Sequence, residues 1–195
     1  MNDNIKRIII GISGASGAPL AVEVLRALQK LPDWETHLTI TLGAEKTIAQ
    51  ETSLSIEYVR SLADVYHDIH NIGACIASGT FQTEGMIVVP CSMKTVSGIA
   101  TGYSENLLLR AADVVLKERR KLVLVARETP LNSIHLRNLL SLSDMGVTII
   151  PPMLTYYNSP TSVEDITRHI AGKILDQFNI SYDGMCRWNP EGDPA

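Results

Sequence analysis

The sequence predicts an α/β protein built on a doubly wound parallel sheet, with helices packed against both faces. Short β-branched or apolar runs alternate along the chain with longer segments whose apolar residues follow helical spacing. The run at residues 86–90 reads M-I-V-V-P without a polar break, which is typical of a strand covered on both faces. This alternation indicates three layers with the sheet in the middle.

The composition fits one globular domain, expected to span residues 1–195. Of the 195 residues, 45% are hydrophobic and 19% are charged, enough for a full core. The net charge of −4 gives no reason to expect a nucleic-acid partner. No apolar run approaches the length of a membrane span, and the run after Lys6-Arg7 is too short and too broken for a signal peptide. The cytoplasm is therefore the expected compartment.

The first predicted strand and helix flank a glycine-rich turn, G-I-S-G-A-S-G at residues 11–17. Residues 8–10 are all Ile, as expected for a buried strand, and apolar residues recur at helical spacing over 18–30. Such a turn points backbone N–H groups and the positive end of a helix dipole at one spot, which favours an anion, usually a phosphate. Ser13 and Ser16 would add hydroxyl donors. A tight turn without a ligand remains the alternative, because the spacing matches neither the dinucleotide nor the P-loop pattern.

The later elements continue the alternation. Further strands are predicted at 36–42, 86–90, 121–126 and 147–150. Helices are predicted at 44–52, 55–63, from about 92–95 onward, at 105–118, at 132–145, and after a cap at Thr161 or Ser162; residues 69–83 and 156–160 are expected to be loops, and the tail after Ser181 irregular.

Ligands of doubly wound sheets bind at the carboxyl ends of the strands, so the residues there are candidate site residues. Hydroxyl groups, a Lys and an Arg follow four of the five predicted strands. Lys94 opens a helix, where the dipole disfavours a cation, and this conflict favours a functional role. The five ends carry Gly14-Ala15-Ser16, Thr41, Ser92-Met93-Lys94-Thr95, Arg127-Glu128 and the Tyr156-Tyr157 loop.

Several polar residues also have ordinary structural explanations. Arg110 and Lys117 lie two turns apart on one predicted helix face, and Asp113 between them can pair with Lys117. Cys91 is expected to be a small buried residue, since the sequence places no His to activate it. Glu51, like Glu128, could do acid–base chemistry, although most glutamates are solvated.

Cysteine and histidine spacing predicts no metal site. The three cysteines form no C-x-x-C pair, which indicates neither a disulfide framework nor a zinc site. His67 and His70, beside Asp64 and Asp68, could suggest a metal. No further ligand cluster supports it, so we expect a solvated loop.

With these residues assembled, the chain resembles the UbiX-type flavin prenyltransferases, a family that includes small proteins of bacterial phenolic and aromatic-acid decarboxylase systems. The resemblance extends from about Lys6 to Trp188. It rests on 11–17 (G-I-S-G-A-S-G), 35–38 (E-T-H-L), 90–95 (P-C-S-M-K-T), 110–119 (R-A-A-D-V-V-L-K-E-R), 127–130 (R-E-T-P), Pro151-Pro152 with Tyr157, and 175–178 (L-D-Q-F).

The resemblance implies a flavodoxin-like fold that binds reduced FMN and dimethylallyl phosphate. It implies that the prenyl group is joined to flavin N5 and then to C6, closing a fourth ring. The prenylated FMN would serve a UbiD-type decarboxylase acting on aromatic acids. The family forms homo-oligomers, with dodecamers that carry sites at subunit contacts, so the same assembly is expected here.

The resemblance also assigns roles to residues of this chain. The residues implied to hold FMN are Gly14, Ala15, Ser16, Thr41, Ser92, Met93, Lys94, Thr95 and Arg127. Those implied at the prenyl phosphate are Lys117, Arg127, Tyr157 and Lys173, with Arg110 and Trp188 near the site. The implied catalytic set is Ser16, Glu51, Lys117 and Glu128, in which Ser16 and the two carboxylates move protons. Thr41 and Lys173 stand where close relatives have Ser and Arg.

The residue chemistry favours a metal-independent transferase. The chain has no Asp-rich magnesium motif, so Lys and Arg would stabilise the leaving monophosphate. A flavin-dependent cysteine decarboxylase remains one alternative, but it needs a His base, and the sequence does not show which His would serve. A non-catalytic flavin carrier or decarboxylase accessory subunit is the second alternative. The joint presence of Lys117, Glu128 and Lys173 favours the transferase.

Overall fold

The computed structural model describes residues 5–188 and has six parallel strands in one sheet, in the order β3-β2-β1-β4-β5-β6. The predicted doubly wound α/β fold is confirmed. Without the edge strand β3, the other five strands stand in the order 2-1-3-4-5 of flavodoxin-like sheets. The strands are β1 (Lys6–Ile12), β2 (Trp34–Ile40), β3 (Val65–His67), β4 (Gly85–Cys91), β5 (Lys121–Ala126) and β6 (Thr148–Ile149).

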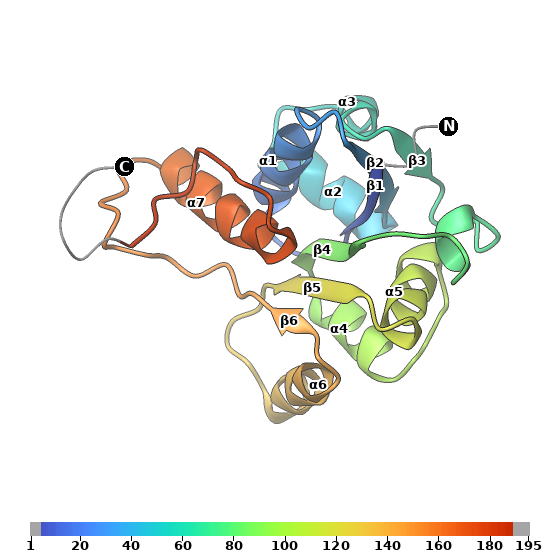
Figure 1. Cartoon of the computed structure of the whole chain (residues 1–195). Helices are drawn as coiled ribbons and strands as arrows, with labels where there is room; N and C mark the ends of the chain where they lie inside the picture. The colour runs from blue at the N-terminus through green and yellow to red at the C-terminus, as the bar shows by residue number, and fades with distance from the viewer. Residues whose placement is uncertain (1–4, 189–195) are drawn as a thin grey trace.

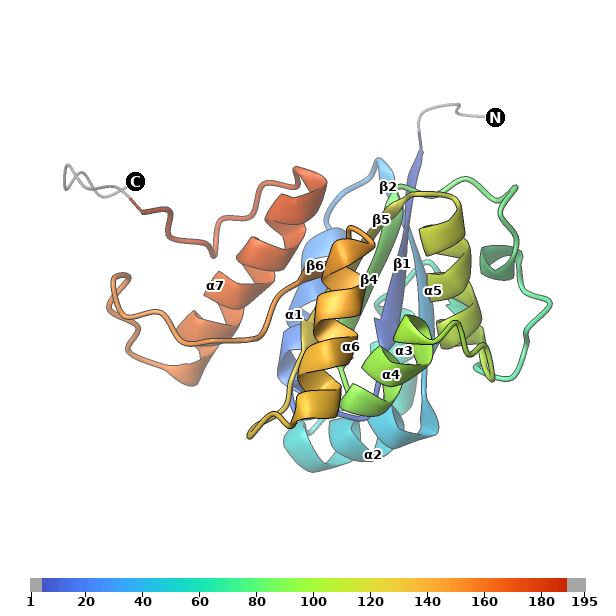
Figure 2. The same cartoon turned by 90° about the horizontal axis from the view of Figure 1, so that it is seen from below.

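Helices cover both faces of the sheet (Figure 1). α1 and α7 pack together on one face, whereas α4, α5 and α6 cover the other; Figure 2 shows α7 and α5 on opposite sides of the strands. Within the described residues, no helix is long and apolar enough to cross a membrane. The helices are α1 (Ala18–Leu28), α2 (Leu42–Glu51), α3 (Ile56–Ser61), α4 (Met93–Ala100), α5 (Leu107–Lys117), α6 (Ser133–Asp144) and α7 (Val163–Leu175), with short 3₁₀ turns η1 (Cys75–Ala77) and η2 (Asp176–Phe178).

Three consecutive isoleucines of β1 divide between the two faces. Ile8 and Ile10 join the core formed with α1 and α7, whereas Ile9 packs among residues of α4, α5 and α6. Alternate residues of a strand point to opposite faces, so a run without a polar break is buried on both. Each of the three is at most 1% exposed. β1 is therefore the central strand around which both layers pack.

Side-chain caps fix the helix starts and shift several predicted boundaries. The Thr41 hydroxyl accepts a hydrogen bond from the N–H of Ala44 at 3.2 Å, so α2 begins earlier than predicted and β2 ends before it. Asn106 caps α5 in the same way. Of the two predicted caps for α7, the structure uses Ser162, in a capping box with Asp165. The irregular tail is confirmed through residue 188, and residues 189–195 lie outside the described part of the chain.

The edge strand β3 was not predicted, because it has only three residues, all half-buried, and therefore no clear apolar pattern. The expectation that His67 lies in a solvated loop is wrong. Its imidazole stacks on His37 of β2, with ring centroids 5.2 Å apart. Two further metal-ligating side chains, those of His37 and Cys75, lie close to His67. His70 is not part of this group and instead lines the first cavity described below.

Gly85 begins β4 at φ 147°, and a Cβ on it would overlap the carbonyl oxygen of Lys121 on β5. We expect Gly85→Ala to lower the free energy of unfolding by about 3 kcal/mol or more, because the clash adds to a backbone strain of about 1–3 kcal/mol. Gly102→Ala is the control, since Gly102 has φ 68° but open space around it. Urea denaturation measures both variants. An equal loss at the two positions would show that the contact with β5 does not matter.

Candidate active site

A cavity of about 380 Å³ opens at the carboxyl ends of β1, β2 and β4. This volume is typical of small-ligand sites, and β1 and β4 flank the switch point where such sheets bind ligands. His70 and Glu105 line the cavity as well. Five of the nine residues implied to bind FMN line it: Gly14, Thr41, Ser92, Lys94 and Thr95.

One wall of the cavity is bare backbone. A Cβ on Gly14 would lie 3.0 Å from the Cα of Gly43, and a Cβ on Gly43 would lie 3.3 Å from the Cα of Gly14. The turn after β1 and the first turn of α2 therefore touch backbone to backbone, which requires small residues at both positions. This contact places Thr41 and Gly14 on the same side of the cavity.

The hydroxyl of Ser13 is part of the framework. Ser13 is 1% exposed; its Oγ donates to the carbonyl oxygen of Pro90 at 3.0 Å and accepts from the N–H of Ser92 at 2.8 Å. The expectation that Ser13 donates to a ligand is therefore wrong, because both of its bonds join β1 to the end of β4. Ser92 in turn caps α4, accepting from the N–H of Thr95 at 3.3 Å.

Glu51, the last residue of α2, occupies the N-terminus of α1. Its Oε2 accepts hydrogen bonds from the N–H groups of Gly17 and Ala18, both at 2.8 Å. A carboxylate at this end of a helix is stabilised by the helix dipole. The anion at the start of α1 is thus a side chain of the protein. The Ala15 N–H donates to the carbonyl oxygen of Ser13 at 2.9 Å, so the turn N–H groups left for a ligand are those of Gly14 and Ser16.

The environment of Glu51 keeps it ionised at neutral pH. Burial raises the pKa of this carboxyl. Hydrogen bonds from Ser16, Gly17 and Ala18, together with the charge of Arg127, outweigh burial and hold its pKa below the ordinary value of 4.5. The structure therefore brings Ser16, Glu51 and Arg127 together, as a carboxylate with a hydroxyl and a cation beside it. Such a group is ionised at neutral pH and is free to act as a proton acceptor.

Lys94 stands at the rim of the cavity. Its side chain is 84% exposed, and its Nζ lies 4.0 Å from a carboxylate oxygen of Glu105. An exposed pair of this length contributes little, so the ammonium is available to a ligand phosphate. The side chain of Met93, the first residue of α4, by contrast packs in the core. A flavin contact of Met93 would therefore use its backbone.

A second cavity, of about 430 Å³, gathers Tyr157, Lys173 and Trp188 around the segment that follows β6 and around α7. The Tyr157 ring meets the rings of Trp188 and His169 edge-on, with centroids 5.3 Å and 5.7 Å away. The two cavities share no lining residue. Three of the residues implied near the prenyl phosphate thus line one cavity, but this cavity is separate from the first.

His169 is a site residue that sequence reasoning missed. It is 5% exposed, and its Nε2 lies 3.3 Å from the Tyr157 hydroxyl. Its Nδ1 has no hydrogen-bond partner among the described residues. Burial, and then the charge of Lys173, lower the pKa of His169, so the ring is neutral at neutral pH. The available signal was its position four residues before Lys173 on one helix face.

The remaining predicted residues do not line either cavity. α5 starts at the first cavity, so Lys117 at its end lies about 16 Å further along the helix, at 1.5 Å per residue. Lys117 pairs with Glu118, and Asp113 pairs with Arg110 at 2.8 Å, so the predicted pairing of Asp113 with Lys117 is wrong. Glu128 is exposed after β5. The roles of Arg110, Lys117 and Glu128 stay predictions.

Cys91 is confirmed as a buried small residue. It is fully buried at the end of β4, and burial strongly raises the pKa of its thiol. A thiol that stays protonated is a poor nucleophile.

Comparisons with known proteins decide the family. Residues 1–175 match the Flavoprotein family. A probable UbiX-like flavin prenyltransferase from Streptomyces sp. (strain D7) is 54% identical over 182 residues, which cover 93% of this chain and 91% of the relative. The chain belongs to the UbiX-like flavin prenyltransferases. It is thus a flavoprotein, and the resemblance seen in its motifs is confirmed.

Two solved structures of UbiX-like proteins share the fold. A dodecameric FMN-dependent UbiX-like decarboxylase from Escherichia coli O157:H7 has a TM-score of 0.93 and 51% identity, covering 94% of this chain and 99% of its own. The AnUbiX (PadA1) structure, in complex with FMN and dimethylallyl pyrophosphate, has a TM-score of 0.93 and 47% identity, covering 95% and 98%. The flavodoxin-like fold of the UbiX-like family is therefore confirmed as well.

Hydrogen bonding holds the folded-state pKa of Glu51 below 4.5, so the ionised carboxylate stabilises the fold above that pH. This stabilisation is lost as the pH falls from 4.5 toward the folded-state pKa. We expect Glu51→Gln to lower the free energy of unfolding by about 1–2 kcal/mol at pH 7 and by much less near pH 3. Urea denaturation at both pH values measures this. Glu57→Gln, an exposed glutamate of α3, is the control and should change little. A pH-independent loss at Glu51 would rule out the charge as its cause.

Proposed function

We propose that this protein acts as a single-domain flavin prenyltransferase, which joins the dimethylallyl group of dimethylallyl phosphate to N5 and C6 of reduced FMN. The bond from the allylic carbon to the phosphate oxygen breaks, the phosphate leaves with the electron pair, and N5 loses its proton as it bonds to that carbon. The prenyl double bond then takes up a proton, and C6 loses one as its bond to the prenyl group closes the fourth ring. The observation that carries the proposal is the switch-point cavity, lined by Gly14, Thr41 and Ser92, in a member of the UbiX-like family.

The donor set of the first cavity fits FMN. The hydroxyls of Ser92 and Thr95, the ammonium of Lys94 and the backbone at Gly14 offer several donors to a phosphate within one cavity. Bound there, reduced FMN supplies the electron-rich N5 and C6 positions. Ser16 and the ionised Glu51 lie at the adjoining turn, where Glu51 accepts a proton and Ser16 relays it.

The second cavity supplies the groups that fit the prenyl phosphate. Lys173 and the Tyr157 hydroxyl are donors to a leaving phosphate, and the faces of Tyr157 and Trp188 favour an allylic cation beside them. Arg127 adds a further cation near Glu51. The chemistry needs no metal at the phosphate. The product, prenylated FMN, is proposed to serve a UbiD-type decarboxylase in the cytoplasm.

A homo-oligomer, proposed to be a dodecamer, would bring the second cavity of one copy to the first cavity of another. Large apolar side chains are exposed on α6 and after β6, among them Ile134, Leu140, Met153 and Tyr156 at 61%, 62%, 70% and 80%. Surfaces of this kind mark protein contacts. We expect light scattering at micromolar concentration to give an oligomer. A fully active monomer would contradict the shared site.

One observation favours the alternative cysteine decarboxylase. His70 lines the first cavity, so a histidine is available there although the sequence did not place one. The identity to named flavin prenyltransferases favours prenyl transfer. A peptide ending in cysteine, tested for loss of CO₂, separates the two activities.

The direct test supplies reduced FMN with dimethylallyl phosphate, or with the pyrophosphate, under anaerobic conditions. We expect the mass of the flavin to rise by one C₅H₈ unit with the monophosphate, because the second cavity offers cations but the chain has no Asp-rich motif for a pyrophosphate with magnesium. Mass spectrometry of the extracted flavin measures this. FMN that binds but is recovered unchanged would point to the flavin carrier.

Lys173→Ala is expected to reduce kcat/KM for the prenyl phosphate while sparing FMN affinity. A charge-assisted hydrogen bond contributes about 1.5–3 kcal/mol, so its loss should lower kcat/KM roughly ten- to a hundredfold. Steady-state assays vary dimethylallyl phosphate at saturating reduced FMN, with EDTA present throughout.

Lys30→Ala, an exposed lysine that lines neither cavity, is the control and should behave like wild type. Equal kcat/KM for Lys173→Ala and the control would show that Lys173 is an ordinary surface lysine and does not bind the prenyl phosphate. Loss of wild-type activity in EDTA that Mg²⁺, but not Zn²⁺, restores would remove the metal-independent mechanism.

A further inference from the structure

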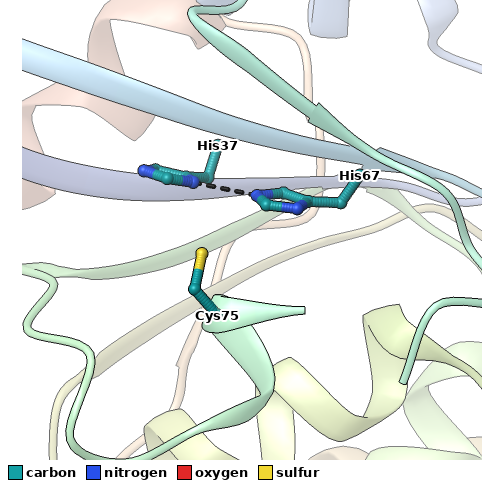
Figure 3. A group of neighbouring side chains, drawn as sticks. All are labelled: His37, His67 and Cys75. Atoms are coloured by element: carbon teal, nitrogen blue, oxygen red, sulfur yellow. Dashed lines mark hydrogen bonds between the residues drawn. The ribbon is translucent and has the colours of Figure 1, made fainter. Parts of the chain in front are cut away.

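Three metal-ligating side chains meet outside both cavities: His37 on β2, His67 on β3 and Cys75 at the start of η1. Figure 3 shows the two imidazoles side by side, with the Cys75 sulfur pointing toward them. One ring nitrogen of each histidine and the Cys75 Sγ all lie within 4.8 Å of one another. No step of the proposed prenyl transfer uses these residues, so the cluster needs its own explanation.

We propose that His37, His67 and Cys75 bind one Zn²⁺ ion. Two imidazole nitrogens and a thiolate are the borderline-soft donors that zinc prefers over calcium or magnesium. Three protein ligands leave the fourth tetrahedral position to water, and Cys75 is exposed, so solvent reaches that position. Binding releases the thiol proton of Cys75 to solvent.

The distances require only small movements. His37 Nδ1 and His67 Nε2 are 2.9 Å apart. Two nitrogens on a tetrahedral zinc stand about 3.4 Å apart, and a nitrogen and a sulfur about 3.6 Å, given bonds of about 2.0–2.1 and 2.3 Å. The rings must therefore separate slightly while Cys75 moves inward. Cys75 is free to do so because it lies on the surface, on a 3₁₀ turn of the 69–83 loop.

A carboxylate already orients one of the ligands. His37 Nε2 lies 2.8 Å from Oε1 of Glu35, which also accepts from Arg7 at 2.8 Å. This partner places the His37 proton on Nε2 and leaves the Nδ1 lone pair facing His67. Zinc-binding histidines usually donate their second N–H to such a carboxylate. His37 is 3% exposed, and the edge contact with Phe81 holds its ring.

Zinc at this point would join the edge strand β3 to the loop that follows it. Between His67 and Cys75 the chain passes Ile69 and His70, which line the first cavity. The ion would therefore order one wall of that cavity from outside, as a structural clip. It touches no group of the proposed reaction, so this inference does not depend on the proposed function.

The experiment titrates the metal-free full-length chain with Co²⁺ and then with Zn²⁺. We expect one equivalent of Co²⁺ to give the visible bands of a tetrahedral site and a thiolate-to-cobalt charge-transfer band, and Zn²⁺ to displace them. Cys75→Ser should remove the charge-transfer band. Glu35→Gln should weaken the affinity about ten- to a hundredfold, as is usual when the hydrogen-bond partner of a metal ligand is changed.

Cys186→Ser is the matched control, since Cys186 is also an exposed free cysteine but lies outside the cluster. It should keep the charge-transfer band, and Zn²⁺ should raise the Tm of wild type and of this control but not of Cys75→Ser or His67→Asn. The absence of the band in wild type, or a band and a Tm rise that survive Cys75→Ser, would overturn the zinc site.

Discussion

The hydroxyl of Ser13 holds the ends of β1 and β4 together at the point where the two halves of the sheet diverge. Both of its hydrogen bonds are buried, and a buried polar group without its partners is costly. The turn after β1 and the turn after β4 therefore begin side by side. Gly14 and Ser92, the first cavity-lining residues of these turns, are held near each other by this side chain and by the hydrogen bond from the Ser13 N–H to the Pro90 carbonyl oxygen at 3.2 Å. The cavity is thus built on strand ends, which position a site more precisely than loops do.

Side chains of the protein already accept hydrogen bonds from some of the N–H groups at the helix N-termini around the cavity. Glu51 takes the N–H groups of Gly17 and Ala18, Thr41 caps α2, and Ser92 caps α4. A ligand phosphate therefore depends on side chains such as Lys94 and on the free turn N–H groups rather than on a bare helix end. The same arrangement places the ionised Glu51 beside the turn.

The parts of the fold that follow local patterns could be predicted from the sequence. The apolar runs of β1, β4 and β5 and the capped helices α6 and α7 have a period that the residues alone display. β3 could not be predicted, because its order comes from pairing with β2 and not from its own three residues. Five of the residues that line the first cavity were predicted because the strand ends of one sheet converge whatever the side-chain details are.

Contacts between distant segments could not be predicted from the sequence. The capping of α1 by Glu51 depends on how α2 packs against α1. The cluster of His37, His67 and Cys75 joins three elements, and the spacing of these residues matches no metal motif. Lys117, whose role is implied by the resemblance alone, lies at the end of α5 away from the first cavity, so its role stays a prediction.

The separation of the two cavities is the constraint that shapes the proposed mechanism. The first cavity lies at the carboxyl edge of the sheet, whereas Tyr157, Lys173 and Trp188 belong to α7 and its flanking segments. Two groups of residues that act on one bond must lie within a few ångströms of it. Because a single chain holds them in cavities without a common residue, the phosphate-binding groups that complete one flavin site would come from another copy. Assembly would then be part of catalysis: in the proposed oligomer, the exposed apolar side chains of α6 would stabilise the contact, and the contact would complete the site.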